Sequence, residues 1–121
     1  MKYLQIIMPN GERWAVPISI IAANRATYYA DKDAKREGLT KEERDKLYEE
    51  EYNYTIEDEL EIYDWAPNNM DWVDVKDHAV ELGVEKMSER GYQEGWVNGE
   101  KTIIDLVDSS EQKVMKEVKS G

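Results

Sequence analysis

The sequence contains no cysteine and no phenylalanine, and it has a single histidine among 121 residues. The absence of cysteine excludes disulfides, thiolate metal sites and a thiol nucleophile. No apolar stretch approaches the about 20 residues of a membrane span, and the first residues lack the cleavage site of a signal peptide. The sequence therefore predicts a cytoplasmic protein that does not contact membranes.

Apolar residues nevertheless make up 40% of the chain, and four tryptophans and eight tyrosines supply bulk for a core. A chain of this length fits a single domain. The formal net charge of -11 disfavours direct binding to nucleic-acid phosphates, which proteins bind through lysine and arginine. It favours a basic partner protein, or a protein that normally binds nucleic acid.

The negative charge is concentrated in the middle third of the chain. No basic residue lies between Lys46 and Lys76, whereas ten acidic residues do. The same segment contains six of the twelve aromatic residues. Because a solvated acidic tail would lack such rings, the segment is predicted to be folded.

The amino-terminal third predicts a hairpin followed by a helix. Residues 2–8 alternate as a strand does, Asn10-Gly11 is a strong hairpin signal, and residues 12–17 return as a second strand. A helix over about 19–37 follows, with Ser19 as its N-cap. Its core stripe is predicted to comprise Ile20, Ala23, Thr27, Ala30 and Ala34, with Arg25, Lys32 and Arg36 on the opposite face.

The middle of the chain predicts two or three further helices. Thr40 and Glu43 have the spacing of a capping box that opens a second helix. The apolar pattern changes phase near Thr55, which predicts a break there and a third helix capped by Thr55. Asp71 is expected to cap a short fourth helix, although a strand over residues 72–82 is nearly as well supported.

The carboxyl-terminal part predicts a second hairpin at Asn98-Gly99, between residues 92–97 and 100–107, and a short helix over 109–118. The fold class is therefore α+β. One small antiparallel sheet is formed by the two terminal hairpins, and three to five helices pack against it. The whole of residues 1–121 forms one domain, with an acidic helical insertion at about 40–82.

No motif in the sequence predicts catalysis. There is no glycine-rich phosphate loop, and His78, the only histidine, has no nucleophile motif nearby. Asp71, Asp74 and Asp77 do not have the alternate spacing of a calcium loop. We therefore predict a non-enzymatic protein with no catalytic residue, no metal and no cofactor.

The acidic, aromatic middle segment predicts an interaction surface. Carboxylates three or four residues apart on a helix lie about 5–6 Å apart, a separation comparable to that of nucleic-acid phosphates. Such a surface would occupy a basic groove of a nucleic-acid-binding host protein, with aromatic rings as anchors. The predicted partner-binding residues are Glu49, Glu50, Glu51, Tyr52, Glu57, Asp58, Glu59, Glu61, Tyr63, Asp64, Trp65, Asp71, Trp72 and Asp74.

Three alternatives remain open from the sequence. The acids could form a solvated surface whose aromatic residues point inward. The chain could be an assembly module that forms a homodimer through a hairpin edge. The least favoured alternative is a small hydrolase.

The overall charge and the stretch Trp65-Ala66-Pro67-Asn68-Asn69-Met70-Asp71-Trp72 resemble the short acidic proteins that bacteriophages encode against host defences, including anti-restriction and anti-CRISPR proteins. This resemblance implies an inhibitor of a host defence protein that acts by binding, without catalysis.

Overall fold

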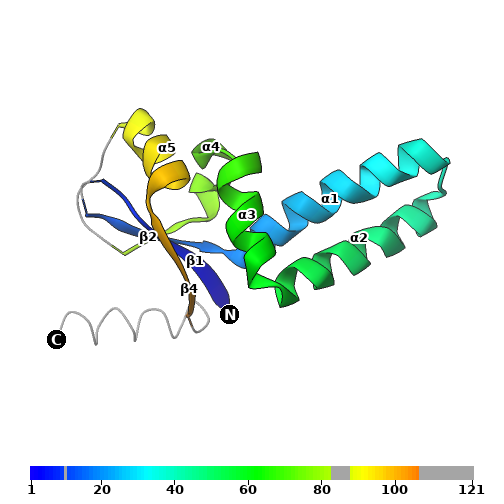
Figure 1. Ribbon diagram of the computed structural model, residues 1–121, viewed down its shortest axis with the longest axis horizontal. Coiled ribbons are helices and arrows are strands. Elements are labelled where there is room, and N and C mark those ends of the chain that lie inside the picture. Colours follow the sequence, from blue (N-terminus) through cyan, green and yellow to red (C-terminus); the bar gives the residue numbers. More distant parts are fainter. Residues whose placement is uncertain (10, 83–87, 107–121) are drawn as a thin grey trace.

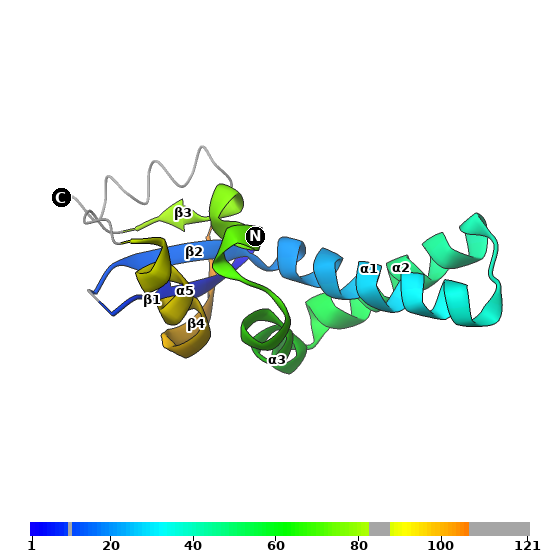
Figure 2. The ribbon, with the colours of Figure 1, turned by 90° about the horizontal axis from the view of Figure 1, so that it is seen from above.

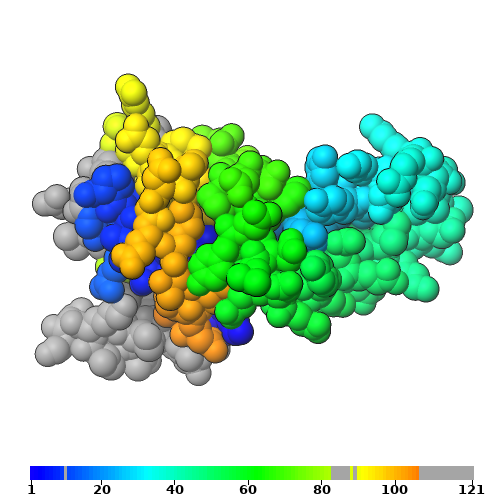
Figure 3. All heavy atoms as spheres, viewed as in Figure 1, coloured from blue at the N-terminus to red at the C-terminus, as the bar shows by residue number. Residues whose placement is uncertain are grey.

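The computed structural model describes residues 1–9, 11–82 and 88–106, which form an α+β fold. A four-stranded antiparallel sheet packs against helices to form a head, and two long helices project from it as an antiparallel hairpin (Figures 1 and 2). Space-filling atoms show the end of this helical hairpin as a separate lobe (Figure 3). No helix among the described residues is both long and apolar enough to span a membrane.

The predicted amino-terminal hairpin is confirmed. Strand β1 (Lys2–Ile7) pairs antiparallel with β2 (Arg13–Pro17). The connecting turn is closed by the amide of Met8, which donates to the carbonyl of Glu12 at 2.8 Å. Gly11 adopts a φ of +88°, a conformation that glycine reaches without steric cost. Asn10 lies outside the described residues.

The predicted second hairpin is wrong in its first half. The residues before Gly99 form helix α5 (Glu89–Asn98), which Ser88 caps by accepting a hydrogen bond from the amide of Gly91. Tyr92 and Trp96 lie one helical turn apart and are both buried, so a helix places both rings in the core. The pair Asn98-Gly99 therefore ends a helix here. The helix predicted at 109–118 lies outside the described residues.

Strand β4 (Glu100–Asp105) crosses the molecule to pair antiparallel with β1. Helix α4 (Trp72–Val75), the 3-10 turn η1 (Lys76–His78) and strand β3 (Val80–Glu81) precede it in the chain, so both interpretations of residues 72–82 hold in part. Strand β3 pairs with β2, and the strand order is β3-β2-β1-β4.

The main core lies between the sheet and the helices. Leu4 and Ile6 of β1 and Met8 directly after it belong to this core, as their alternation predicts, together with the fully buried Trp96 of α5. The other face of the sheet carries a smaller cluster, which contains the buried residues Tyr3, Ala15 and Leu106.

Helix α1 (Ile18–Glu37) begins directly after its N-cap Pro17, two residues earlier than the predicted N-cap Ser19 implies. The predicted core stripe is also wrong. The helix is rotated so that Arg25, predicted to face solvent with Lys32 and Arg36, lies on the buried face. The buried residues of α1 are Ile18, Ile21, Ala22, Arg25, Ala26 and Ala30. This rotation buries Ile18 and Ile21 in the core and places Arg25 against its partners on α2 and α3.

Helix α2 (Lys41–Glu57) begins with the predicted capping box of Thr40 and Glu43. The break that separates it from α3 (Glu59–Asn69) lies at Asp58 and not at Thr55. Thr55 stays in α2 because its hydroxyl donates to the carbonyl of Glu51 at 2.7 Å. The carboxylate of Asp58 caps α3 by accepting from the amide of Leu60.

Candidate functional site

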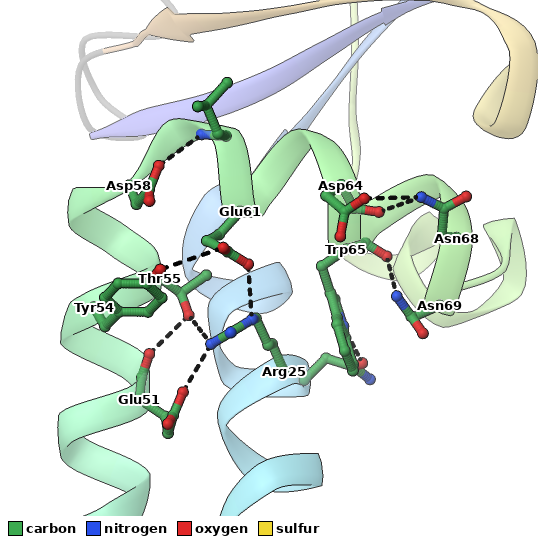
Figure 4. A network of polar contacts seen from close by, with 12 residues as sticks. Arg25, Glu51, Tyr54, Thr55, Asp58, Glu61, Asp64, Trp65, Asn68 and Asn69 are labelled. Carbon is green, nitrogen blue, oxygen red and sulfur yellow. Dashed lines mark hydrogen bonds and ion pairs between the residues drawn. The ribbon is translucent and has the colours of Figure 1, made fainter.

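Arg25 occupies the point where α1, α2 and α3 meet (Figure 4). It is 9% exposed. Its Nη1 lies 2.8 Å from a carboxylate oxygen of Glu51 and donates to the hydroxyl of Thr55 at 3.0 Å. Its Nε forms an ion pair with Glu61 at 3.3 Å. One guanidinium therefore links all three helices.

Aromatic rings surround this ion cluster. The guanidinium of Arg25 lies 4.7 Å from the ring centroid of Tyr29 and 5.3 Å from that of Tyr54. The hydroxyl of Tyr54 donates to Glu61 at 3.3 Å. The negative charge of Glu61, together with desolvation and the charge of Asp58, raises the pKa of Tyr54 above its usual value. The junction is a rigid connection between the helical hairpin and the head.

Three of the predicted partner-binding acids form ion pairs within the protein. Glu51 and Glu61 pair with Arg25, and Glu59 of α3 pairs with Lys2 of β1 at 3.2 Å. These carboxylates fix α2 and α3 to the rest of the molecule. They are less available to a cationic partner than the sequence predicted, because their charge is partly compensated by Arg25 and Lys2.

Four further predicted acids accept local hydrogen bonds. Asp58 caps α3, and Asp74 accepts the backbone amide of Asp71 at 2.7 Å. Asp71 itself accepts from the side chain of Gln93 at 3.1 Å. Asp64 accepts from Asn68 but remains exposed (Figure 4). Asp58, Asp71 and Asp74 thus position helix ends and the contact between α4 and α5.

The predicted aromatic anchors point into the molecule. Trp65 and Trp72 are buried, and the indole of Trp65 donates to Asn24 of α1. Tyr63 is half-buried, and its hydroxyl accepts the backbone amide of Ile103 in β4 at 2.8 Å. Tyr52 is half-buried and stacks on Tyr48. These rings hold elements together, and Trp65 and Trp72 leave little surface for a partner.

Three predicted acids remain, Glu49, Glu50 and Glu57, and together with the exposed Asp64 we call them the acidic ridge. Glu49, Glu50 and Glu57 are exposed on α2, outside the buried face that Thr55 marks. Asp64 is exposed on α3. None of the four forms an ion pair with a residue that the structure describes.

Two exposed residues beside the ridge were missing from the prediction. Tyr54, on the flank of α2, is 48% exposed, and Leu60, one turn before Asp64 on α3, is 77% exposed. Leu60 lies one turn before the exposed Asp64, but the face of α3 that points outward depends on the break at Asp58. The large exposure of Leu60 marks a surface that offers apolar contact next to carboxylates.

Within the described ranges, no three histidine, aspartate or glutamate side chains gather closely enough to hold a metal ion. His78 is exposed at the end of η1. No family model, no curated protein and no solved structure matches this chain.

Proposed function

We propose that this protein is a non-enzymatic binding module that occupies a basic surface of another protein, one that otherwise handles nucleic acid. The acidic ridge carries the proposal, because its four carboxylates are exposed and no described cation neutralises them. Uncompensated like charges repel one another within a folded protein, and a basic partner would relieve that repulsion.

The ridge is held rigidly. Glu49 and Glu57 lie two turns apart on α2, about 12 Å along its axis. Asp64 is fixed relative to them because Arg25 joins α2 to α3 through Glu51 and Glu61. A partner would therefore meet carboxylates at set separations, without first ordering them, and this limits the entropic cost of binding.

Apolar side chains beside the carboxylates provide short-range affinity. Leu60 and Tyr54 are both exposed, and the hydroxyl of Tyr54 is tethered to Glu61. Electrostatic attraction mainly speeds and orients association, whereas desolvated aromatic and apolar residues supply much of the binding energy. Exposed carboxylates together with exposed apolar side chains fit a surface that binds a protein better than an acidic surface that only contacts water.

The resemblance to acidic phage proteins directed against host defences supports an inhibitory role. A protein that covers a basic nucleic-acid groove prevents nucleic acid from entering it, without any catalytic step. Bacterial defence proteins that bind nucleic acid are therefore the partner class to test first.

The test is affinity capture from bacterial lysate at low and high salt, followed by mass spectrometry of the proteins released between the two. The variant Glu49→Lys/Glu57→Lys/Asp64→Lys should lose the captured protein, because the ridge changes sign. The matched control is Asp77→Lys/Glu94→Lys/Glu100→Lys, which makes the same change in net charge at exposed positions outside the ridge.

We expect the control variant to retain the partner, and duplex DNA to compete with the wild-type protein for it. Equal loss of the partner in both variants would mean that overall charge, and not the ridge, governs capture. Full retention by the ridge variant would refute the proposal.

A further inference from the structure

A groove lies at the free end of the helical hairpin, remote from the sheet. Its volume is about 330 Å³, and its lining residues are Glu37, Leu39, Glu43, Lys46, Leu47 and Glu50. Glu37 comes from the end of α1, Leu39 from the connection, and the other four from the first half of α2. The volume is at the lower end of the range of ligand sites, which suits one long side chain.

The local structure at this end is well defined. Gly38 adopts a φ of +66° and, like Leu39, donates its amide to the carbonyl of Ala34, which ends α1. The capping box of Thr40 then starts α2 at once. The groove is therefore built on two helix ends with fixed geometry, and it does not depend on a long loop.

The groove combines an apolar lining with negative charge. Leu39 and Leu47 are half-buried. Glu43 receives hydrogen bonds from Thr40, which lower the pKa of Glu43 and keep its carboxylate ionised at neutral pH. Glu37 pairs with Arg36 at 3.8 Å, whereas Glu50 pairs with no described cation. Arg36 and Lys46 together therefore leave the three carboxylates of the groove only partly compensated.

From this arrangement we infer that the groove binds an arginine side chain presented by the protein partner. The aliphatic stem of arginine would lie on Leu39 and Leu47, and its guanidinium would face Glu43 and Glu50. Planar guanidinium groups suit carboxylates better than the point charge of lysine does. The inference rests on the proposed function, because it gives one specific contact to the basic partner.

Lys46 provides a second, independent test of the inference. Its ammonium lines the same groove and opposes a bound guanidinium. The variant Lys46→Met keeps the stem and removes the charge, so it should bind the arginine probe more tightly. Non-specific apolar binding of the peptide to Leu39 and Leu47 would not depend on the charge of Lys46.

The experiment titrates the full-length protein with the peptide Ac-Gly-Leu-Arg-Gly-NH2 at an ionic strength of about 20 mM, where screening is weak. Amide NMR spectra report the sites of contact. The matched control peptide carries citrulline in place of arginine, which preserves shape and removes charge. Protein variants are Lys46→Met, Glu50→Gln and, as a remote control, Glu94→Gln on α5.

We expect saturable shifts confined to residues 37–50 and weaker binding of the citrulline peptide. Glu50→Gln should weaken binding about two- to fivefold, and Lys46→Met should strengthen it by a similar factor. Glu94→Gln should leave it unchanged. No binding, shifts spread over all acidic surfaces, equal binding of citrulline, or an equal effect of Glu94→Gln would each overturn the inference. Because Glu49, Glu57 and Asp64 do not line the groove, this titration and the capture experiment can fail separately.

Discussion

The head and the helical hairpin are stabilised by different means. In the head, large side chains such as Trp96 and Ile6 are completely buried between sheet and helices. Toward its free end the hairpin buries only small side chains such as Ala30, and its ordering relies on caps and on ion pairs such as that between Arg44 and Asp31. Hydrophobic burial tolerates salt, whereas exposed ion pairs are screened by it. The hairpin should therefore respond to solution conditions far more than the head does.

The largest expected effect is in the head. Trp96→Ala removes a fully buried ring, together with the hydrogen bond from its indole to the carbonyl of Met70 at 2.8 Å. We expect a loss of about 3–5 kcal/mol in the free energy of unfolding, measured by urea denaturation. Val97→Ala, at the exposed next position, should cost far less. Similar losses in both variants would mean that α5 does not anchor the core.

The next effect lies at the junction between the two regions. Arg25→Ala leaves Glu51 and Glu61 without their cation, although both carboxylates retain partial contact with water. We expect destabilisation of about 2–3 kcal/mol, below the range for fully buried pairs. Arg36→Ala, on the exposed end of the same helix, should change stability by less than about 0.5 kcal/mol. A small effect of Arg25→Ala would show that the helices hold their arrangement without the cluster.

A smaller effect is expected at the tip of the hairpin. Thr40→Ala removes the hydrogen bond that the hydroxyl accepts from the amide of Glu43, and it should cost about 1 kcal/mol. Hydrogen exchange should accelerate near residues 40–47 and stay unchanged in the head. Thr40→Ser keeps the acceptor and serves as the control. Faster exchange throughout the molecule would contradict the separation of the two regions.

The smallest effect concerns alkaline pH. The folded-state pKa of Tyr54 is raised, so its contribution is complete below the ordinary tyrosine pKa of about 10 and is lost as pH rises through the folded value. The stability of Tyr54→Phe should therefore decline less steeply above about pH 10 than that of the wild type. Urea midpoints across this range would test it, and parallel curves for the two proteins would contradict the assignment.

The sequence could predict those parts of the fold that depend on residues close together in the chain. The first hairpin and the Thr40 capping box depend on residues a few positions apart, and both are confirmed. Asn98-Gly99 misled because the same pair also suits a helix end, and Tyr92 and Trp96 share one face in a strand as well as in a helix. Only packing against other elements decides between the two. The rotation of α1 was unpredictable for the same reason, since the partners of Arg25 lie on other helices.

The acid-rich segment itself was evident from composition, but its division into structural and available carboxylates was not. Glu50 and Glu51 are neighbours in sequence, yet Glu51 faces Arg25 and Glu50 lines the end groove. The two side chains have different roles because adjacent residues of a helix point in different directions. Neither Leu60 nor Tyr54 could be assigned to the surface without the position of the break at Asp58.

The hydrogen bond between Tyr63 and the backbone of Ile103 has a consequence for how copies of this protein meet. Strand β4 is an outer strand of the sheet, and an unblocked outer strand is a template on which another chain can extend the sheet. The hydroxyl of Tyr63 accepts the hydrogen bond of the Ile103 amide, which is a donor in the middle of that strand. A second molecule that added a strand there would have to break this hydrogen bond, so Tyr63 makes extension of the sheet at β4 less favourable.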